Sequence, residues 1–87
     1  MNNKKMLIVE DERALSDILK EKFTKTGFEV EVASNGLEGL TTAVEQKPDI
    51  ILLDIVMPKM DGITMLKKLR ADNWGADVPV IVLTNLT

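Results

Sequence analysis

Two short apolar segments of this chain carry carboxylates at or near their ends. Glu10 and Asp11 directly follow residues 6–9, and Asp54 lies inside the run IILLDIV, residues 50–56. A carboxylate in such a strand is costly to bury unless it is solvated, paired or bound to a metal. If the two strands are neighbours, the three carboxylates converge and repel one another. Mg²⁺ prefers oxygen ligands of this kind, so the sequence predicts a Mg²⁺ site.

A fourth residue could serve the same place. Thr84 follows the apolar run 80–83 and would offer a hydroxyl donor to an anion bound beside the metal. Simpler interpretations stay open: acids at residues 10–12 favour the N-terminus of a following helix, and Thr84 is also an ordinary strand residue. For Asp54 the simple interpretation is a strand end open to water.

The elements that must position these residues alternate between strand and helix patterns. Strands are expected at 6–9, 28–32, 50–56 and 80–83, and helices at 12–26, 36–46 and 63–71. This order, with right-handed crossovers, predicts an open parallel sheet with helices on both faces. Ligands of such α/β sheets bind outside the carboxyl ends of the strands, where the acids lie.

The apolar periodicity also predicts which side chains face the core. In the second helix we expect Leu37, Leu40 and Val44 to face inward, and in the third helix Ile63, Leu66 and Leu69. The second strand alternates apolar and acidic residues, which indicates a half-exposed strand at an edge of the sheet. Residues 80–83 read as a buried strand.

Composition limits the classes of function. The 87 residues make one small domain, with 45% hydrophobic and 29% charged residues and a net charge of −3. The acidic balance argues against nonspecific binding to nucleic acid or anionic membranes. The chain has no Cys and no His, which removes thiolate sites, Ser-His triads and most zinc sites. No signal peptide or membrane span is recognisable, so a cytoplasmic location is expected.

At the candidate site the chain resembles the receiver domains of bacterial response regulators. The resemblance rests on the pair Glu10-Asp11, on Asp54, on the segment PKMDG at residues 58–62 and on Thr84. It implies a flavodoxin-like doubly wound α/β sheet over the single domain 1–87. The sheet is expected to be truncated to (βα)3β with strand order 2-1-3-4.

The resemblance also implies a role for each residue. Asp54 would take a phosphoryl group from a phosphohistidine on a sensor histidine kinase or phosphotransfer protein. Mg²⁺ would be held by Glu10, Asp11, Asp54 and the carbonyl of Val56, with Asp11 the more direct ligand of the first two. Thr84 would hydrogen-bond the phosphoryl oxygens. The implied protein is a signalling module rather than an enzyme.

The chain departs from the family after residues 80–83, because a further helix, strand and helix normally follow, with a Lys that pairs with the phosphoryl group. We therefore expect residues 80–83 to form an exposed edge strand and part of the first helix to expose its apolar face. A symmetric homodimer through one of these surfaces is our hypothesis. A fragment of a longer regulator is the alternative.

Two other functions stay open from the sequence. A Mg²⁺-dependent phosphohydrolase with an aspartyl-phosphate intermediate would usually carry a second acid two residues after the nucleophile, where this chain has Val56. A self-association or interaction module independent of phosphate would keep the acids without using them.

Overall fold

The computed structural model describes residues 3–54 and 61–83 of the chain, in which strands and helices alternate. The elements are β1 (Lys5–Val9), α1 (Arg13–Thr26), β2 (Glu29–Ala33), α2 (Gly36–Gln46), β3 (Ile50–Asp54), α3 (Gly62–Ala71) and β4 (Val80–Leu83). Their order and approximate bounds confirm the predicted alternation.

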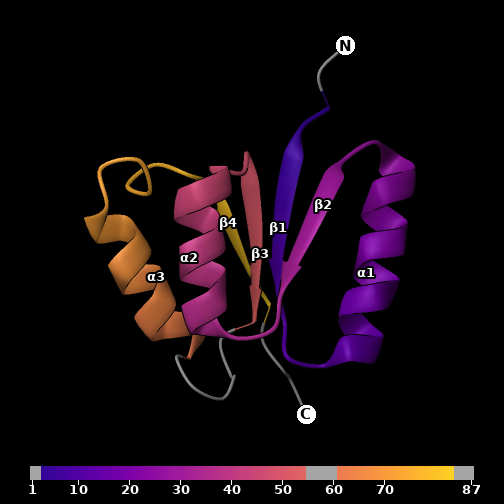
Figure 1. Ribbon diagram of the computed structural model, residues 1–87, viewed down its shortest axis with the longest axis horizontal. Helices are drawn as coiled ribbons and strands as arrows, with labels where there is room; N and C mark the ends of the chain where they lie inside the picture. The colour runs from indigo at the N-terminus through magenta and orange to yellow at the C-terminus, as the bar shows by residue number, and fades with distance from the viewer. Residues whose placement is uncertain (1–2, 55–60, 84–87) are drawn as a thin grey trace.

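All four strands form one parallel sheet in the order β2-β1-β3-β4 (Figure 1). In the register, Val9 lies between Ala33 on one side and Leu53 on the other, and Asp54 pairs with Leu83 of β4. The doubly wound α/β fold and its strand order are confirmed. β2 is at one edge, as its alternating sequence predicted.

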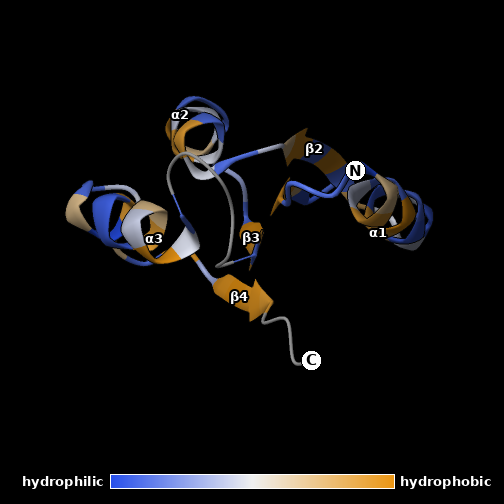
Figure 2. Ribbon diagram, turned by 90° about the horizontal axis from the view of Figure 1, so that it is seen from below, coloured by the Kyte–Doolittle hydropathy of each residue, from blue (hydrophilic) through white to orange (hydrophobic). Residues whose placement is uncertain are grey.

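The helices divide between the two faces of the sheet, with α2 and α3 on one face and α1 on the other (Figure 2). Each face carries its own apolar cluster. The cluster under α2 and α3 includes Leu7, Ile51 and Leu53, and the cluster under α1 includes Ile8 and Leu52. Adjacent residues of β1 and β3 therefore serve opposite faces, which explains why both strands are continuous apolar runs.

The inward face of α2 differs from the predicted one. Leu37 and Val44 are exposed by 54% and 39%, whereas Gly36, Gly39 and Ala43 are buried and Leu40 is partly buried. The reason is a close approach to β1. A Cβ atom built on Gly39 would lie only 2.8 Å and 2.9 Å from the two Cγ atoms of Val9. Small residues therefore face the sheet, and the larger side chains are turned toward its margins.

Two further core expectations are also wrong in part. Ile63 of α3 is 52% exposed, because Met65 and Leu69 fill the inward face of that helix. β4 is not a buried strand, since Ile81 and Val82 are exposed by 49% and 41%. β4 lies at the end of the sheet, so one of its sides has no neighbouring strand among residues 3–54 and 61–83.

Two helix ends are set by residues that commonly cap helices. The Asn35 side chain accepts a hydrogen bond from the backbone N–H of Glu38, so Asn35 is the N-cap of α2. Gly27 ends α1 at φ 112°, in the left-handed region that glycine tolerates best. With 14 residues, α1 is the longest helix described, and none of the described helices has the length and apolar character needed to cross a membrane.

The side chain of Arg70 makes three hydrogen bonds to the link between α3 and β4. Nη1 of Arg70 donates hydrogen bonds to the carbonyls of Gly75, Ala76 and Val78 at 2.9, 3.3 and 2.6 Å. These bonds tie the end of α3 to the segment that leads into β4. Arg70 therefore helps to set where β4 meets β3.

Candidate functional site

The topology brings the predicted acids to one edge of the sheet. β1 and β3 are neighbours, and Val9 pairs with Leu53. The next residues, Glu10 and Asp54, therefore end adjacent strands side by side. The backbone N–H of Glu10 also donates to the carbonyl of Ala33 at 3.0 Å, which extends the pairing of β1 with β2 up to the site.

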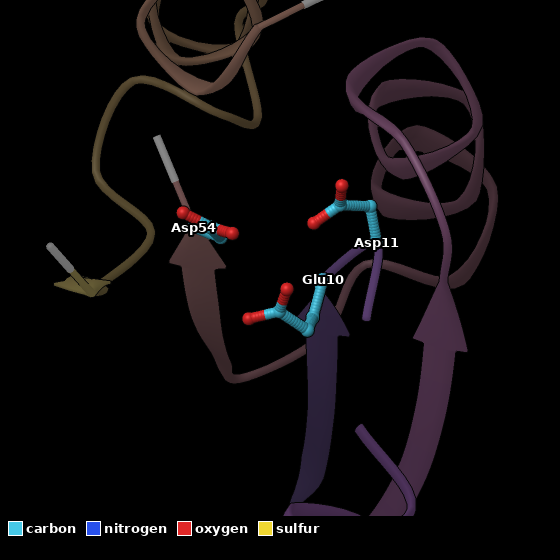
Figure 3. A group of neighbouring side chains, drawn as sticks. All are labelled: Glu10, Asp11 and Asp54. Atoms are coloured by element: carbon cyan, nitrogen blue, oxygen red, sulfur yellow. The ribbon is translucent and has the colours of Figure 1, made fainter. Parts of the chain in front are cut away.

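Glu10, Asp11 and Asp54 converge as predicted. Each offers one carboxylate oxygen, and these three oxygens all lie within 4.8 Å of one another. In Figure 3 the side chains of Glu10 and Asp11 turn from the end of β1 toward Asp54 at the tip of β3. The three differ in burial: Glu10 is only 4% exposed, Asp54 is half-buried and Asp11 is exposed.

The acidic cluster makes it unfavourable for Glu10, its most buried member, to ionise. Burial and hydrogen bonding to Asp11 and Asp54, together with the charge of Asp54, raise the pKa of Glu10 from 4.5 to about 7. The backbone N–H of Glu12 acts in the opposite direction, since it donates to Oε2 of Glu10 at 3.1 Å. The net effect is a buried carboxyl group that keeps its proton until the pH rises to about 7.

The donor set fits a hard divalent cation. All three side chains present carboxylate oxygens, and a cation among them would offset the repulsion that disfavours the ionised form of Glu10. The hydrogen bond from Glu12 to Glu10 also joins the site to the first turn of α1, which begins at Arg13. The Glu10 side chain is therefore held in place from the backbone of the next segment.

Two predicted site residues, Val56 and Thr84, lie outside the described residues. β4 ends at Leu83, which pairs with Asp54 in the register. Sequence analysis found every member of the described acidic group. It did not foresee that Glu10, rather than Asp54, is the most buried acid. The signal was available, because Glu10 comes directly after four buried residues of β1 and this strand lies between β2 and β3.

The family model described as the response regulator receiver domain matches residues 6–87. Among curated proteins, the chain is similar to the DNA-binding dual master transcriptional regulator RpaA of Synechocystis. The two are 40% identical over 82 residues, which are 94% of this chain and 34% of that protein. The chain thus spans about a third of the length of the curated relatives it matches.

Solved structures agree in fold. The chemotaxis protein CheY4 of Vibrio cholerae matches with a TM-score of 0.93 and 30% identity, covering 99% of this chain and 72% of that one. The receiver domain of the sensor histidine kinase PA1611 from Pseudomonas aeruginosa matches with a TM-score of 0.92 and 29% identity, over 95% of this chain and 68% of that one. That structure is described as having a magnesium ion coordinated in the active-site cleft.

Proposed function

This chain belongs to the response regulator receiver domain family, and we propose that it is a phosphoacceptor module of a two-component system. In this proposal Asp54 receives a phosphoryl group from a phosphohistidine on a sensor histidine kinase or phosphotransfer protein. The supporting observation is the convergence of Glu10, Asp11 and Asp54 at the carboxyl ends of β1 and β3. That edge is where open α/β sheets bind their ligands.

The cofactor that we propose is Mg²⁺, held by the carboxylates of Glu10, Asp11 and Asp54 and by the backbone carbonyl of Val56. Two features of this chain support the proposal: the converging carboxylate oxygens and the raised pKa of Glu10. Both indicate that a positive charge within the cluster would be stabilising. When bound, Mg²⁺ supplies the charge neutralisation that phosphoryl transfer requires. The PA1611 receiver domain offers a precedent for such an ion.

The proposed reaction is a displacement at phosphorus. A carboxylate oxygen of Asp54 forms the new O–P bond while the N–P bond of the phosphohistidine breaks, and its electron pair stays on the imidazole nitrogen. Glu10 and Asp11 hold their own carboxylate oxygens beside Asp54, because both residues directly follow the end of β1. Thr84 would donate a hydrogen bond from its hydroxyl to a phosphoryl oxygen.

The module is proposed to be a switch and not a catalyst with turnover. A phosphohydrolase of the aspartyl-phosphate type would usually carry a second acid two residues after Asp54, where this chain has Val56. We therefore expect one phosphoryl group per chain and no multiple turnover of a small phosphomonoester. Measuring inorganic phosphate released from such a substrate tests this expectation directly.

We propose that the partners are the phosphodonor protein and a second copy of this chain, bound through β4 or α1. The net charge of −3 gives no reason to expect nucleic acid or an anionic membrane as a partner. A cytoplasmic location is proposed with the two-component role, because the sensor kinases of such systems transfer the phosphoryl group inside the cell.

The test is the intact mass of the protein after incubation with phosphoramidate, a small donor that carries a P–N bond, in the presence of Mg²⁺. We expect the wild type to gain the mass of one phosphoryl group and Asp54→Asn to gain none. Asp17→Asn is the matched control, since Asp17 is an exposed residue of α1, and it is expected to react like the wild type. Chelation of Mg²⁺ is expected to suppress the gain. Equal modification of Asp54→Asn would refute the assignment.

A further inference from the structure

A hollow lies beside α2 at the end of the sheet opposite the acidic cluster. It has a volume of about 220 Å³. Its lining comes from the first residues of β1 and β2, from one flank of α2 and from the segment that leads into β3. In Figure 1 these strands start at the top, and their arrowheads point down toward the end where the acids converge. The hollow is therefore separate from the candidate Mg²⁺ site.

The register of β1 and β2 places the charged side chains of the hollow on one face of the sheet. Lys5 pairs with Glu29, and Leu7 pairs with Glu31. Leu7 belongs to the apolar cluster under α2 and α3, and alternate residues of a strand share a face. Lys5, Glu29 and Glu31 therefore lie on the face that α2 covers, near the β2 margin of the sheet.

The hollow forms because α2 packs on β1 through small residues. Gly39 and Ala43 are buried, and Gly39 brings the helix against Val9. The helix thereby covers β1 and leaves the start of β2 bare, where both glutamates are exposed. Leu7 and Pro48, both buried, contribute apolar surface to the lining.

The polar side chains around the hollow have no partner within the described residues. Thr42 and Gln46 line it from α2, and neither side chain makes a hydrogen bond there. No ion pair joins Lys5 to Glu29 or Glu31 in this part of the chain. The hollow thus presents two negative groups, one positive group and two neutral hydrogen-bonding groups to an occupant.

A second hollow, on α1, differs in this respect. It is lined by Ile18, Glu21, Lys22 and Lys25. Glu21 and Lys25 form an ion pair at 3.1 Å, so the only carboxylate of that lining is already matched by a cation. Beside α2, by contrast, all three charges are left for an occupant.

The charges of the hollow select the class of ligand. Two carboxylates and one ammonium group give a net charge of −1, which favours a ligand with one excess positive charge. A bare metal ion is a poor match, because Lys5 repels it and the described acids converge in threes only at the opposite end of the sheet. A volume of about 220 Å³ is below the range of about 300–1,000 Å³ for drug-sized ligands, so the ligand is small.

We propose that this hollow binds a small zwitterion with two cationic groups and one carboxylate, the chemistry of a free basic amino acid such as arginine. The two cationic groups match Glu29 and Glu31, and the carboxylate matches Lys5. The Thr42 hydroxyl and the Gln46 amide supply neutral hydrogen bonds from α2. This site would give the module a second input, distinct from the phosphoryl group.

The first experiment titrates the isotope-labelled 87-residue chain with L-arginine and follows its backbone amide chemical shifts at constant ionic strength and neutral pH. We expect saturable shifts at the amides of Glu31, Thr42 and Gln46. Agmatine lacks the carboxylate and Nα-acetyl-arginine lacks the α-ammonium group. Each is expected to bind more weakly by about two- to five-fold, the contribution of one exposed ion pair. The absence of saturable shifts with arginine would overturn the proposal.

The second experiment assigns each charge to its partner. In Lys5→Met we expect arginine to bind no better than agmatine, because the partner of the carboxylate is gone. In Glu31→Gln we expect both ligands to bind more weakly than in the wild type. Glu45→Gln is the matched control, since Glu45 is an exposed residue of α2 outside the lining, and it is expected to bind arginine normally.

Two results of these variants would contradict the proposal. One is a preference for arginine over agmatine that Lys5→Met retains, and the other is an equal loss of binding in Glu45→Gln and Glu31→Gln. The titration is also repeated with Asp54→Asn, which is expected to bind arginine like the wild type. A dependence on Asp54 would place the ligand in the acidic cluster and overturn the inference, whereas a failure of Asp54 to accept a phosphoryl group leaves it standing.

Discussion

Replacing Glu10 by Gln is expected to stabilise the metal-free protein at alkaline pH. The substitution keeps the size of the side chain and an oxygen that can accept the N–H of Glu12, but it removes the buried negative charge. The pKa of Glu10 is raised from 4.5 to about 7 by burial, by hydrogen bonds to Asp11 and Asp54 and by the charge of Asp54. At about 1.36 kcal/mol for each pH unit, its ionisation costs the fold at most about 3 kcal/mol.

The sign of the pH dependence follows from the direction of this pKa change. Below pH 4.5 Glu10 is protonated in both states and contributes no penalty. Between pH 4.5 and about 7 the unfolded chain releases the proton while the folded chain keeps it, so wild-type stability falls as pH rises. Above about pH 7 the full penalty is present, and Glu10→Gln avoids it.

The assay is urea unfolding in the presence of a chelator, followed by the fluorescence of Trp74, which packs against the main core and is the only Trp. We expect Glu10→Gln to exceed the wild type by up to about 3 kcal/mol at about pH 8 and to match it near pH 4. Glu12→Gln, an exposed neighbour, is the control and is expected to show no such difference. A variant less stable than the wild type at about pH 8, or a difference that does not change with pH, would refute the reasoning.

Three further predictions concern packing and local bonds, each measured as the free energy of unfolding in urea. Gly39→Ala is expected to destabilise the protein by about 1–3 kcal/mol, because the added Cβ would meet Val9. In a Val9→Ala background the same substitution is expected to be neutral or stabilising. Equal effects in both backgrounds would contradict the steric account. Arg70→Met is expected to cost about 1–2 kcal/mol through its lost bonds to loop carbonyls, while Lys68→Met on the same helix has little effect; equal losses would show that those bonds contribute nothing. Asn35→Ala is expected to cost about 1 kcal/mol as a lost N-cap, and an unchanged stability would deny it that role.

The acidic site was predictable because it depends on coarse features of the sequence. The positions of Glu10 and Asp54 at the ends of apolar runs, and the neighbouring placement of those runs in the sheet, are sufficient to bring the carboxylates together. Errors of a residue or two in an element boundary do not change which strand ends meet. The burial of Glu10 was not predicted, although the expected strand order already placed a strand on each side of β1.

The facing of α2 could not be predicted from hydrophobic periodicity. Periodicity assigned Leu37 and Val44 to the core because they are large and apolar, but Gly39 allows the helix to approach Val9 so closely that small residues face the sheet. Which residues of α2 face the sheet is therefore decided by its packing against β1, an element distant in the sequence. The apolar sequence Val80–Leu83 alone indicated a buried strand, and only the family resemblance led us to expect the edge position of β4.

The central claim, that Asp54 is the phosphoryl acceptor, is tested most directly by locating the modification. The protein is treated with phosphoramidate and Mg²⁺ and then with borohydride, which reduces an acyl phosphate to an alcohol, and its peptides are sequenced by mass spectrometry. We predict that Asp54 alone is converted to homoserine and that omission of the phosphodonor leaves it intact. Conversion at Asp11 or Glu10 with Asp54 unchanged would contradict the claim.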